Sequence, residues 1–238
     1  MKRNPSNFKI MIFFTTVRYT ALMAELCRSA KLPCIEMHSK KSQEYRTRNA
    51  KTFVNSNKQI MFTSDVSARG VDYPDVTLIL QVGITEREQY IHRLGRTGRA
   101  CGIEGRGLLL LNLPEANYVQ SILKGLPVEK VTYKRLDESD EIRRIVGTAL
   151  ARVKSSPDLK TAAEDCYKAF IGFHNGYVNK MGWSKQNLCD AAKKFALMIN
   201  CCDNNGDAPR LGSTLVQKMG LSGCGLNTGG GGGYNDRY

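Results

Sequence analysis

Long hydrophobic segments are scarce in this 238-residue sequence. The run from Ile10 to Phe14 has five apolar residues, whereas a helix needs about 20 to cross a bilayer. The run is also too short for a secretory signal, and the N-terminus lacks the Arg/Ser-rich pattern of a transit peptide. We therefore expect no membrane-spanning segment and no secretion.

No Cys-x-x-Cys pair occurs among the eight cysteines, which stand at positions 27, 34, 101, 166, 189, 201, 202 and 224. Cys201 and Cys202 are adjacent, and adjacent residues suit tetrahedral zinc ligation poorly. We therefore predict no metal site. Without a secretory signal, the cysteines are expected to be reduced thiols in an intracellular protein.

Two motifs of nucleotide hydrolases are also absent. The sequence has no Gly-x-x-x-x-Gly-Lys-Ser/Thr loop to cradle phosphates, and no Asp-Glu pair closes an apolar strand to hold Mg²⁺. Any arginine that acts on a phosphoryl group would therefore lack a nucleotide site of its own in this sequence.

Positive charge is abundant and unevenly placed. Lys and Arg total 35 against 22 Asp and Glu, which gives a net charge of +13. Residues 1–135 carry 22 basic and 11 acidic residues, so that segment has a net charge of +11, and residues 136–238 add only +2. The surplus favours a polyanionic partner, either nucleic acid or an acidic membrane face.

Apolar runs typical of buried strands alternate with helical stretches over residues 1–135. Strands are predicted at 9–14, 34–37, 59–63, 77–82 and 107–113, and helices at 17–30, 42–53 (with Ser42 as N-cap) and 86–94. Strands separated by helices predict parallel pairing and an α/β fold, in which ligands gather at the carboxyl ends of the strands.

The pattern changes to helices alone in residues 136–222. They are predicted at 140–154, 158–180 and 184–200. The aromatics Tyr167, Phe170, Phe173 and Tyr177 share one helix face, which favours core packing over base stacking. Residues 223–238 include five consecutive glycines and are predicted to be a disordered, flexible tail.

An arginine-rich stretch runs from His92 to Arg99. Arg93, Arg96 and Arg99 are spaced three apart, so a continued helix would place them on one side. Guanidinium groups bind phosphate oxygens bidentately, and Gly95 and Gly98 would let another surface approach closely. The stretch therefore favours phosphate contact over a solvated basic helix end.

A loop rich in small hydroxyl residues follows the predicted strand at 59–63. Its glycine would let backbone amides reach a phosphate, and Asp72 can accept hydrogen bonds from ribose hydroxyls, although Asp65 and Asp72 are equally suited to capping turns. Thr16 and Arg46 could contact a phosphate backbone, but a capping hydroxyl on a surface helix is the favoured reading of each by itself.

These stretches resemble the motifs of one family. Residues 92–99 resemble motif VI of the DEAD-box RNA helicases, and residues 64–72 resemble their motif V. Residues 13–16 resemble motif IV, and residues 43–46 resemble the Gln-x-x-Arg element after it. Order and spacing agree over about residues 8–135, which implies a RecA-like parallel sheet sandwiched by helices, the helicase C-terminal domain.

The resemblance implies a nucleotide site shared with another domain. Arg96 and Arg99 would be catalytic arginine fingers on the γ-phosphate of ATP, and Gly70 and Asp72 would contact the ribose side of the nucleotide. ATP and Mg²⁺ would be held mainly by a first RecA-like domain, in cis or in trans, which this sequence does not contain.

The resemblance also implies an RNA site without any membrane partner. The residues expected to hold the RNA backbone, or to order the loop that does, are Thr16, Arg46, Ser64 and Asp65. His92 and Arg93 would couple the ATP and RNA sites. Ser64 replaces the usual threonine of the family, and Ser39 stands where glycine is common.

Residues 167–183 and 219–223 are similar to the C-terminal extension of mitochondrial intron-splicing DEAD-box proteins. That similarity implies a mitochondrial location, with the nucleus or cytoplasm as the alternative. We expect an ATP-dependent RNA helicase or RNA chaperone, of which this chain is the second half. A stand-alone RNA-binding or annealing module and a DNA-directed helicase are the alternative functions.

Overall fold

The computed structural model describes residues 8–64, 73–98, 105–131 and 140–228. Contacts divide the chain into two compact units, Met1–Val146 and Gly147–Tyr238. The boundary predicted between residues 135 and 136 lies outside the described residues.

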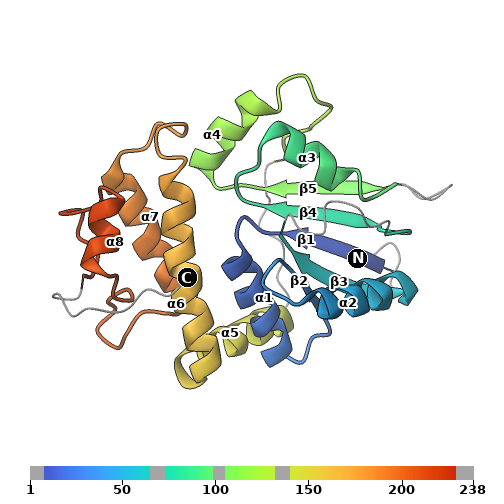
Figure 1. Ribbon diagram of the computed structural model, residues 1–238, viewed down its shortest axis with the longest axis horizontal. Helices are drawn as coiled ribbons and strands as arrows, with labels where there is room; N and C mark the ends of the chain where they lie inside the picture. Colours follow the sequence, from blue (N-terminus) through green and yellow to red (C-terminus); the bar gives the residue numbers. More distant parts are fainter. Residues whose placement is uncertain (1–7, 65–72, 99–104, 132–139, 229–238) are drawn as a thin grey trace. The chain divides into compact units, whose positions relative to one another are not determined.

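The first unit alternates strands with helices around one sheet (Figure 1). Its elements are β1 (Phe8–Phe13), α1 (Val17–Ser29), β2 (Ile35–Met37), α2 (Gln43–Asn55), β3 (Lys58–Thr63), β4 (Leu78–Val82), α3 (Arg87–Leu94), β5 (Arg106–Leu110) and α4 (Leu113–Ile122). The five strands pair in parallel in the order β2-β3-β1-β4-β5. The predicted parallel α/β sheet is therefore confirmed.

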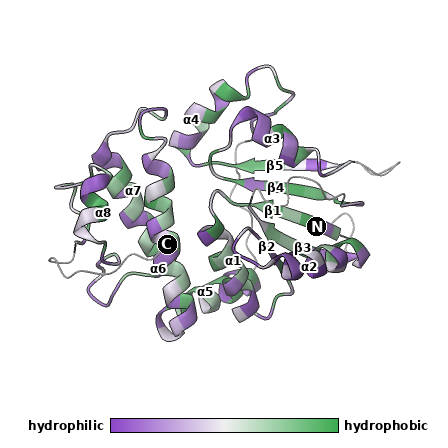
Figure 2. Ribbon diagram, viewed as in Figure 1, coloured by the Kyte–Doolittle hydropathy of each residue, from purple (hydrophilic) through white to green (hydrophobic). Residues whose placement is uncertain are grey.

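The central strands are buried because helices cover the sheet, as parallel sheets require. Met11, Met61 and Ile79 are fully buried on β1, β3 and β4. Phe53 of α2 packs on this cluster and meets Tyr73 edge-on, with ring centroids 5.6 Å apart. Figure 2 shows the strands coloured largely as hydrophobic. The sheet core thus gives a rigid base for the loops at its ends.

The carboxyl ends of four strands lie at one edge of the sheet. Thr63 of β3 is paired with Phe13 of β1 and with Met37 of β2, and Phe13 is also paired with Gln81 of β4. The segments that follow these strands therefore leave the sheet from the same edge, where ligands bind in such folds.

The strand predicted over residues 107–113 ends at Leu110, and α4 begins at Leu113. Asn112 caps α4: its side chain accepts from the backbone N–H of Glu115, and the Glu115 side chain accepts from the backbone N–H of Asn112. This capping box, with Pro114 in the first turn, is a helix-start signal that the apolar run Leu108–Leu111 masks in the sequence.

The second unit is helical. Its helices are α6 (Pro157–Asn175), α7 (Lys185–Met198) and α8 (Ser213–Lys218), and α5 (Asp140–Ser155) crosses the boundary between the units. The predicted helix 158–180 ends at Asn175, and the chain continues through turns to Gly182, which has φ +65°. Short α8 was not predicted.

The compact part of the second unit reaches residue 228. Leu226 is buried, and Leu211 and Thr228 form an isolated parallel bridge. Six residues of the predicted tail therefore belong to the packed unit, because Leu226 supplies an apolar anchor that the glycine content conceals. None of the described helices combines the length and hydrophobicity needed to span a bilayer.

Candidate functional site

Thr16 begins α1 just beyond the end of β1. Its Oγ1 accepts a hydrogen bond from the Tyr19 amide at 3.1 Å, and its carbonyl accepts from the Thr20 hydroxyl at 3.0 Å. A hydroxyl that accepts a bond keeps its own hydrogen for donation. Thr16 therefore caps α1, as predicted for a capping hydroxyl. Its own hydrogen can still be donated to an anion at the carboxyl ends of the strands.

A buried ion network fixes the connection between β2 and α2. Glu36 accepts a hydrogen bond from His38 Nε2 at 2.7 Å, and its other oxygen meets Arg28 at 3.1 Å and Lys41 Nζ at 3.0 Å. The backbone N–H of Lys40 donates to His38 Nδ1 at 3.2 Å, so Nε2 carries the hydrogen that Glu36 accepts. No motif in the sequence marks Glu36.

Glu36 keeps its negative charge although its side chain is only 2% exposed. Burial raises its pKa, but hydrogen bonds from His38 and Lys41 and the charges of Lys41 and Arg28 outweigh burial and lower the pKa to about 2. The carboxylate thus holds the segment that leads into Ser42, which caps α2 by accepting from the Tyr45 amide.

Arg46 lies in the first turn of α2 and is half-buried. Its Nε atom is buried, and no hydrogen-bond partner for that atom occurs within the described ranges. Nearby cations are already engaged with an aromatic ring: Lys41 Nζ lies 5.3 Å, and Arg48 Cζ 5.8 Å, from the Tyr45 ring centroid. Arg46 is therefore a cation in the first turn of α2 whose Nε has no partner within the described ranges.

Ser64 follows β3 and is buried, at 7% exposure. Its amide donates to the Met37 carbonyl at 3.4 Å, and its carbonyl accepts from the Thr63 hydroxyl at 2.8 Å. These bonds fasten Ser64 between the ends of β2 and β3. Its place beside the end of β1, which leads to Thr16, brings two of the predicted RNA-contact residues to one edge.

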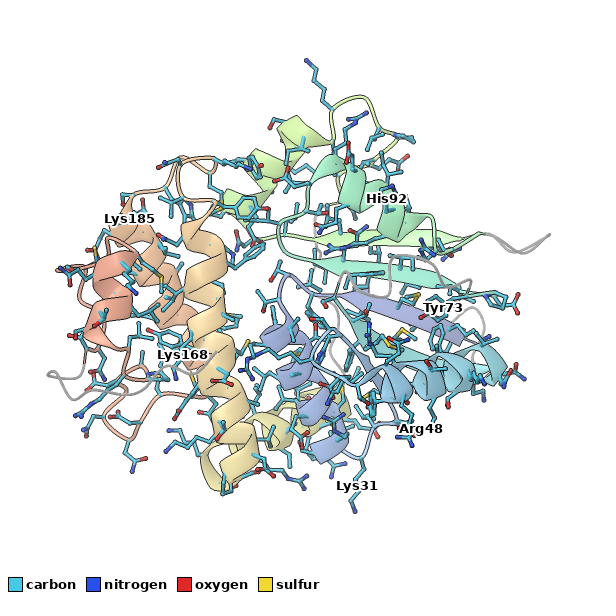
Figure 3. All side chains as sticks on the ribbon, in the orientation of Figure 1. Lys31, Arg48, Tyr73, His92, Lys168 and Lys185 are labelled. Atoms are coloured by element: carbon cyan, nitrogen blue, oxygen red, sulfur yellow. The ribbon has the colours of Figure 1, made fainter. Side chains whose placement is uncertain are left out.

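Helix α3 presents neighbouring residues in opposite directions. Arg93 is buried and its guanidinium lies 5.2 Å from the Phe13 ring centroid, whereas His92 is exposed (Figure 3). Gln81 of β4 donates to the Tyr90 carbonyl at 3.3 Å and fastens the helix to the sheet. Arg93 thus packs internally against Phe13 of β1, whereas His92 is free to face a second surface.

Arg96 lies in a turn and not on α3. The helix ends at Leu94, and the Arg96 amide donates to the Arg93 carbonyl at 3.2 Å. The expectation that Arg93 and Arg96 share one helix side is therefore wrong, because Gly95 ends the helix. The Arg96 charge acts on Tyr73, whose pKa burial raises and Arg96 partly lowers.

Gly98 and Gly105 let two segments of this chain approach each other closely. Gly98 has φ +70°, and a Cβ placed on Gly105 would lie only 2.6 Å from the Gly98 nitrogen. The close approach expected at Gly98 is therefore made by the backbone at Gly105. The Thr97 hydroxyl donates to the Val76 carbonyl and fastens the turn to the chain before β4.

Four predicted site residues lie outside the described residues: Asp65, Gly70, Asp72 and Arg99. No cluster of His, Cys, Asp and Glu in the described ranges could hold a metal ion.

The aromatic face of α6 has one fully buried ring, Tyr167. Phe170, Phe173 and Tyr177 are half-buried. Phe170 stacks on Phe195 of α7 with centroids 4.3 Å apart, and Phe173 and Tyr177 lie 5.1 Å apart. Core packing is thus confirmed for Tyr167, and Phe170 packs on a neighbouring helix.

The second unit also contains a cavity of about 500 Å³ between α5, α6 and the loop after α7. Lys154, Lys160 and Arg210 line it together with Glu164, Asp203 and Asp207. Three positive and three negative side chains balance, so the cavity has no charge preference for an anion or a cation.

Comparison with known proteins shows what this chain is similar to. Residues 3–101 match the family described as helicase conserved C-terminal domain. The chain is 43% identical over 218 residues to DEAD-box ATP-dependent RNA helicase 31 of Oryza sativa subsp. japonica, covering 91% of this chain and 37% of that protein. It is 42% identical over 221 residues to probable DEAD-box ATP-dependent RNA helicase 48 of Arabidopsis thaliana, covering 92% and 26%.

Solved structures of a DEAD-box helicase also match this chain. The chain matches Mss116p DEAD-box helicase domain 2 bound to an RNA duplex with a TM-score of 0.72 and 27% identity, covering 94% of this chain and 86% of that one. It matches Mss116 bound to ssRNA and UDP-BeF with a TM-score of 0.75 and 26% identity, covering 95% and 45%.

The parallel sheet and its flanking helices define a RecA-like helicase C-terminal fold. The chain is similar to the C-terminal domain of DEAD-box helicases, and the match to Mss116p domain 2 also covers most of the helical second unit. It spans about a quarter to two fifths of the length of the curated relatives that it matches.

Proposed function

We propose that this chain is the second RecA-like half of an ATP-dependent RNA helicase or RNA chaperone. One observation carries the proposal: Thr16, Ser64 and the α2 start that bears Arg46 all follow strands that end at the same sheet edge. The names of the relatives, all DEAD-box ATP-dependent RNA helicases, support it.

The RNA backbone is the proposed ligand of that edge. A hydroxyl with a hydrogen to donate at Thr16 and the guanidinium of half-buried Arg46 suit phosphate oxygens. The +11 charge of residues 1–135 adds sequence-independent attraction. Mss116p structures with single-stranded and duplex RNA support the choice of RNA.

ATP is the proposed second ligand, bound together with Mg²⁺ mainly by a first RecA-like domain that the sequence lacks. Arg96, and Arg99 beyond the described residues, would neutralise charge on the γ-phosphate, while Gly70 and Asp72 contact the ribose. His92, exposed on α3, and buried Arg93 would link the two sites. This chain alone is then expected not to hydrolyse ATP.

The assignment of Arg96 as an arginine finger is tested in the full-length protein, or with a first domain supplied in trans. Arg96→Ala is expected to lower RNA-stimulated hydrolysis by about 10³-fold or more while RNA affinity stays nearly constant. Arg48 lies on the exposed side of α2, so Arg48→Ala is the matched control and should leave hydrolysis near its normal rate. Unchanged hydrolysis in Arg96→Ala would contradict the assignment.

The RNA edge is tested by binding to a single-stranded oligoribonucleotide at several salt concentrations. Arg46→Ala is expected to weaken binding about tenfold and to make the salt dependence shallower, and Arg48→Ala to change both little. Equal binding to the deoxyribose strand would favour the DNA-directed alternative. Binding indifferent to ATP in the presence of a first domain would favour the stand-alone RNA module.

We also propose a mitochondrial location, which rests on the similarity of residues 167–183 and 219–223 to extensions of mitochondrial splicing proteins. A fluorescent fusion of the full-length gene product tests it, and signal in the nucleus or cytoplasm would overturn it.

A further inference from the structure

The chain reverses direction directly after α1. The Ala30 amide donates to the Leu26 carbonyl at 3.0 Å, and the Leu32 amide donates to the Cys27 carbonyl at 2.9 Å. Lys31 adopts the left-handed conformation at φ +59°, which permits the reversal. The residues that follow are therefore folded back along the last turns of the helix.

This reversal brings Cys34 against Cys27. The Cys34 Sγ donates to the carbonyl of Ala24, one turn before Cys27, at 3.7 Å. Both cysteines pack on the same cluster of Phe14, Ala24 and Phe62, and each thiol shifts the pKa of the other. A disulfide requires the two cysteines to be neighbours, and the turn after α1 makes them so.

The two thiols differ in acidity. The adjoining Cys34 thiol lowers the pKa of Cys27 against the effect of burial, and the charge of Arg28 lowers it further. The adjoining Cys27 thiol and burial raise the pKa of Cys34. Since the thiolate is the attacking form, Cys27 is the nucleophile of the pair and Cys34 resolves the intermediate.

Access also separates this pair from the buried thiols of Cys166, Cys189, Cys201 and Cys202. Cys27 and Cys34 are half-buried, and Leu32 in the connecting turn is 45% exposed. Burial and the half-buried Cys224 thiol raise the pKa of Cys189, so Cys189 and Cys224 are a second thiol pair, but Cys189 is 0% exposed and closed to a reagent.

We infer that Cys27 and Cys34 form an oxidisable dithiol site that low-molecular-weight disulfides such as oxidised glutathione convert into a Cys27–Cys34 disulfide. The Cys27 thiolate attacks one glutathione sulfur, the glutathione S–S bond breaks, and the first glutathione thiolate leaves and takes up a proton. Cys34 then loses its proton to solvent and attacks the Cys27 sulfur, and the second glutathione thiolate leaves. Two protein thiols are oxidised and one small disulfide is reduced to two thiols.

The test treats the reduced chain with oxidised glutathione and follows intact mass, thiol alkylation and peptide mapping. The expected product has lost two hydrogens, carries no glutathione, and yields a peptide that links residues 27 and 34. Alkylation of both residues after treatment, or glutathione retained on either, would overturn the inference.

Variants assign the order of the two steps. Cys34→Ser is expected to stop at the mixed disulfide on Cys27, and Cys27→Ser to leave Cys34 reduced. Cys189→Ser, which breaks the second thiol pair, is the matched control and should form the linked peptide as the unaltered chain does. Stable glutathione on Cys34 in Cys27→Ser would refute the assigned order, and far-UV circular dichroism verifies that each variant is folded.

Discussion

Replacing Glu36 by Gln would remove the one negative charge that Arg28, His38 and Lys41 share. The folded-state pKa of about 2, against the usual 4.5, corresponds to about 3 kcal/mol in favour of the ionised form. Arg28 and Lys41 are 41% and 31% exposed, so solvent screens part of this. We expect Glu36→Gln to lower the free energy of unfolding of the first unit by about 1–2 kcal/mol at pH 7.

The pH dependence has a defined sign. Because the folded-state pKa of Glu36 is depressed, its contribution is fully present above about pH 4.5 and is lost as the pH falls toward 2. The difference in stability between the natural chain and Glu36→Gln should therefore shrink to about half at pH 3.5.

Urea unfolding followed by far-UV circular dichroism at pH 7 and pH 3.5 measures this difference. Trp183, the single tryptophan, lies in the second unit, so its fluorescence reports that unit separately and should not change. Glu44→Gln, at an exposed site in the first turn of α2, is the control for loss of a carboxylate. A stability difference that is the same at both pH values would refute the reasoning.

Three further substitutions test local features by their effect on melting temperature or unfolding free energy. Gly83→Ala should lower the unfolding free energy by about 1–3 kcal/mol, because Gly83 has φ +84° and a Cβ there would lie 2.7 Å from a Thr15 methyl carbon. Gly147→Ala, in open space on α5, should raise the unfolding free energy by up to about 1 kcal/mol. Equal effects of the two substitutions would contradict this. Tyr167→Phe should be neutral or slightly stabilising, because the buried hydroxyl has no partner within the described ranges, and a loss above about 1 kcal/mol would show that it has one. Asn112→Ala should cost about 1 kcal/mol by removing the cap of α4, and Asn112→Asp, which keeps the acceptor, should not.

Local sequence was enough to predict most of the first unit. Short Ile- and Phe-rich runs such as residues 9–14 predict buried strands because a strand covered on both faces needs apolar side chains throughout. Their alternation with helical stretches predicts parallel pairing, since parallel strands need a crossover. Residues 64–72 and 92–99 resemble motifs V and VI of the DEAD-box helicases, and this resemblance points to the family.

Local sequence failed where two patterns compete. Leu108–Leu111 extends the predicted strand, but the capping box at Asn112 and Glu115 begins a helix there. Arg93 and Arg96 have helical spacing, yet the turn at Gly95 separates them. In both places a short polar or glycine signal outweighs a longer periodic one, because the end of an element depends on where its backbone hydrogen bonds are satisfied.

By itself, the sequence determined the parallel α/β layout, the helical second part and the order of the motifs, because these follow from hydrophobic periodicity and residue spacing. Only the tertiary structure decided that Glu36 holds Arg28, His38 and Lys41, that Arg93 lies on Phe13, and that Cys34 lies against Cys27. The physical reason is that each of these contacts depends on how separate elements turn and pack, and on the burial that strengthens a charge or a thiol interaction, none of which a local pattern contains.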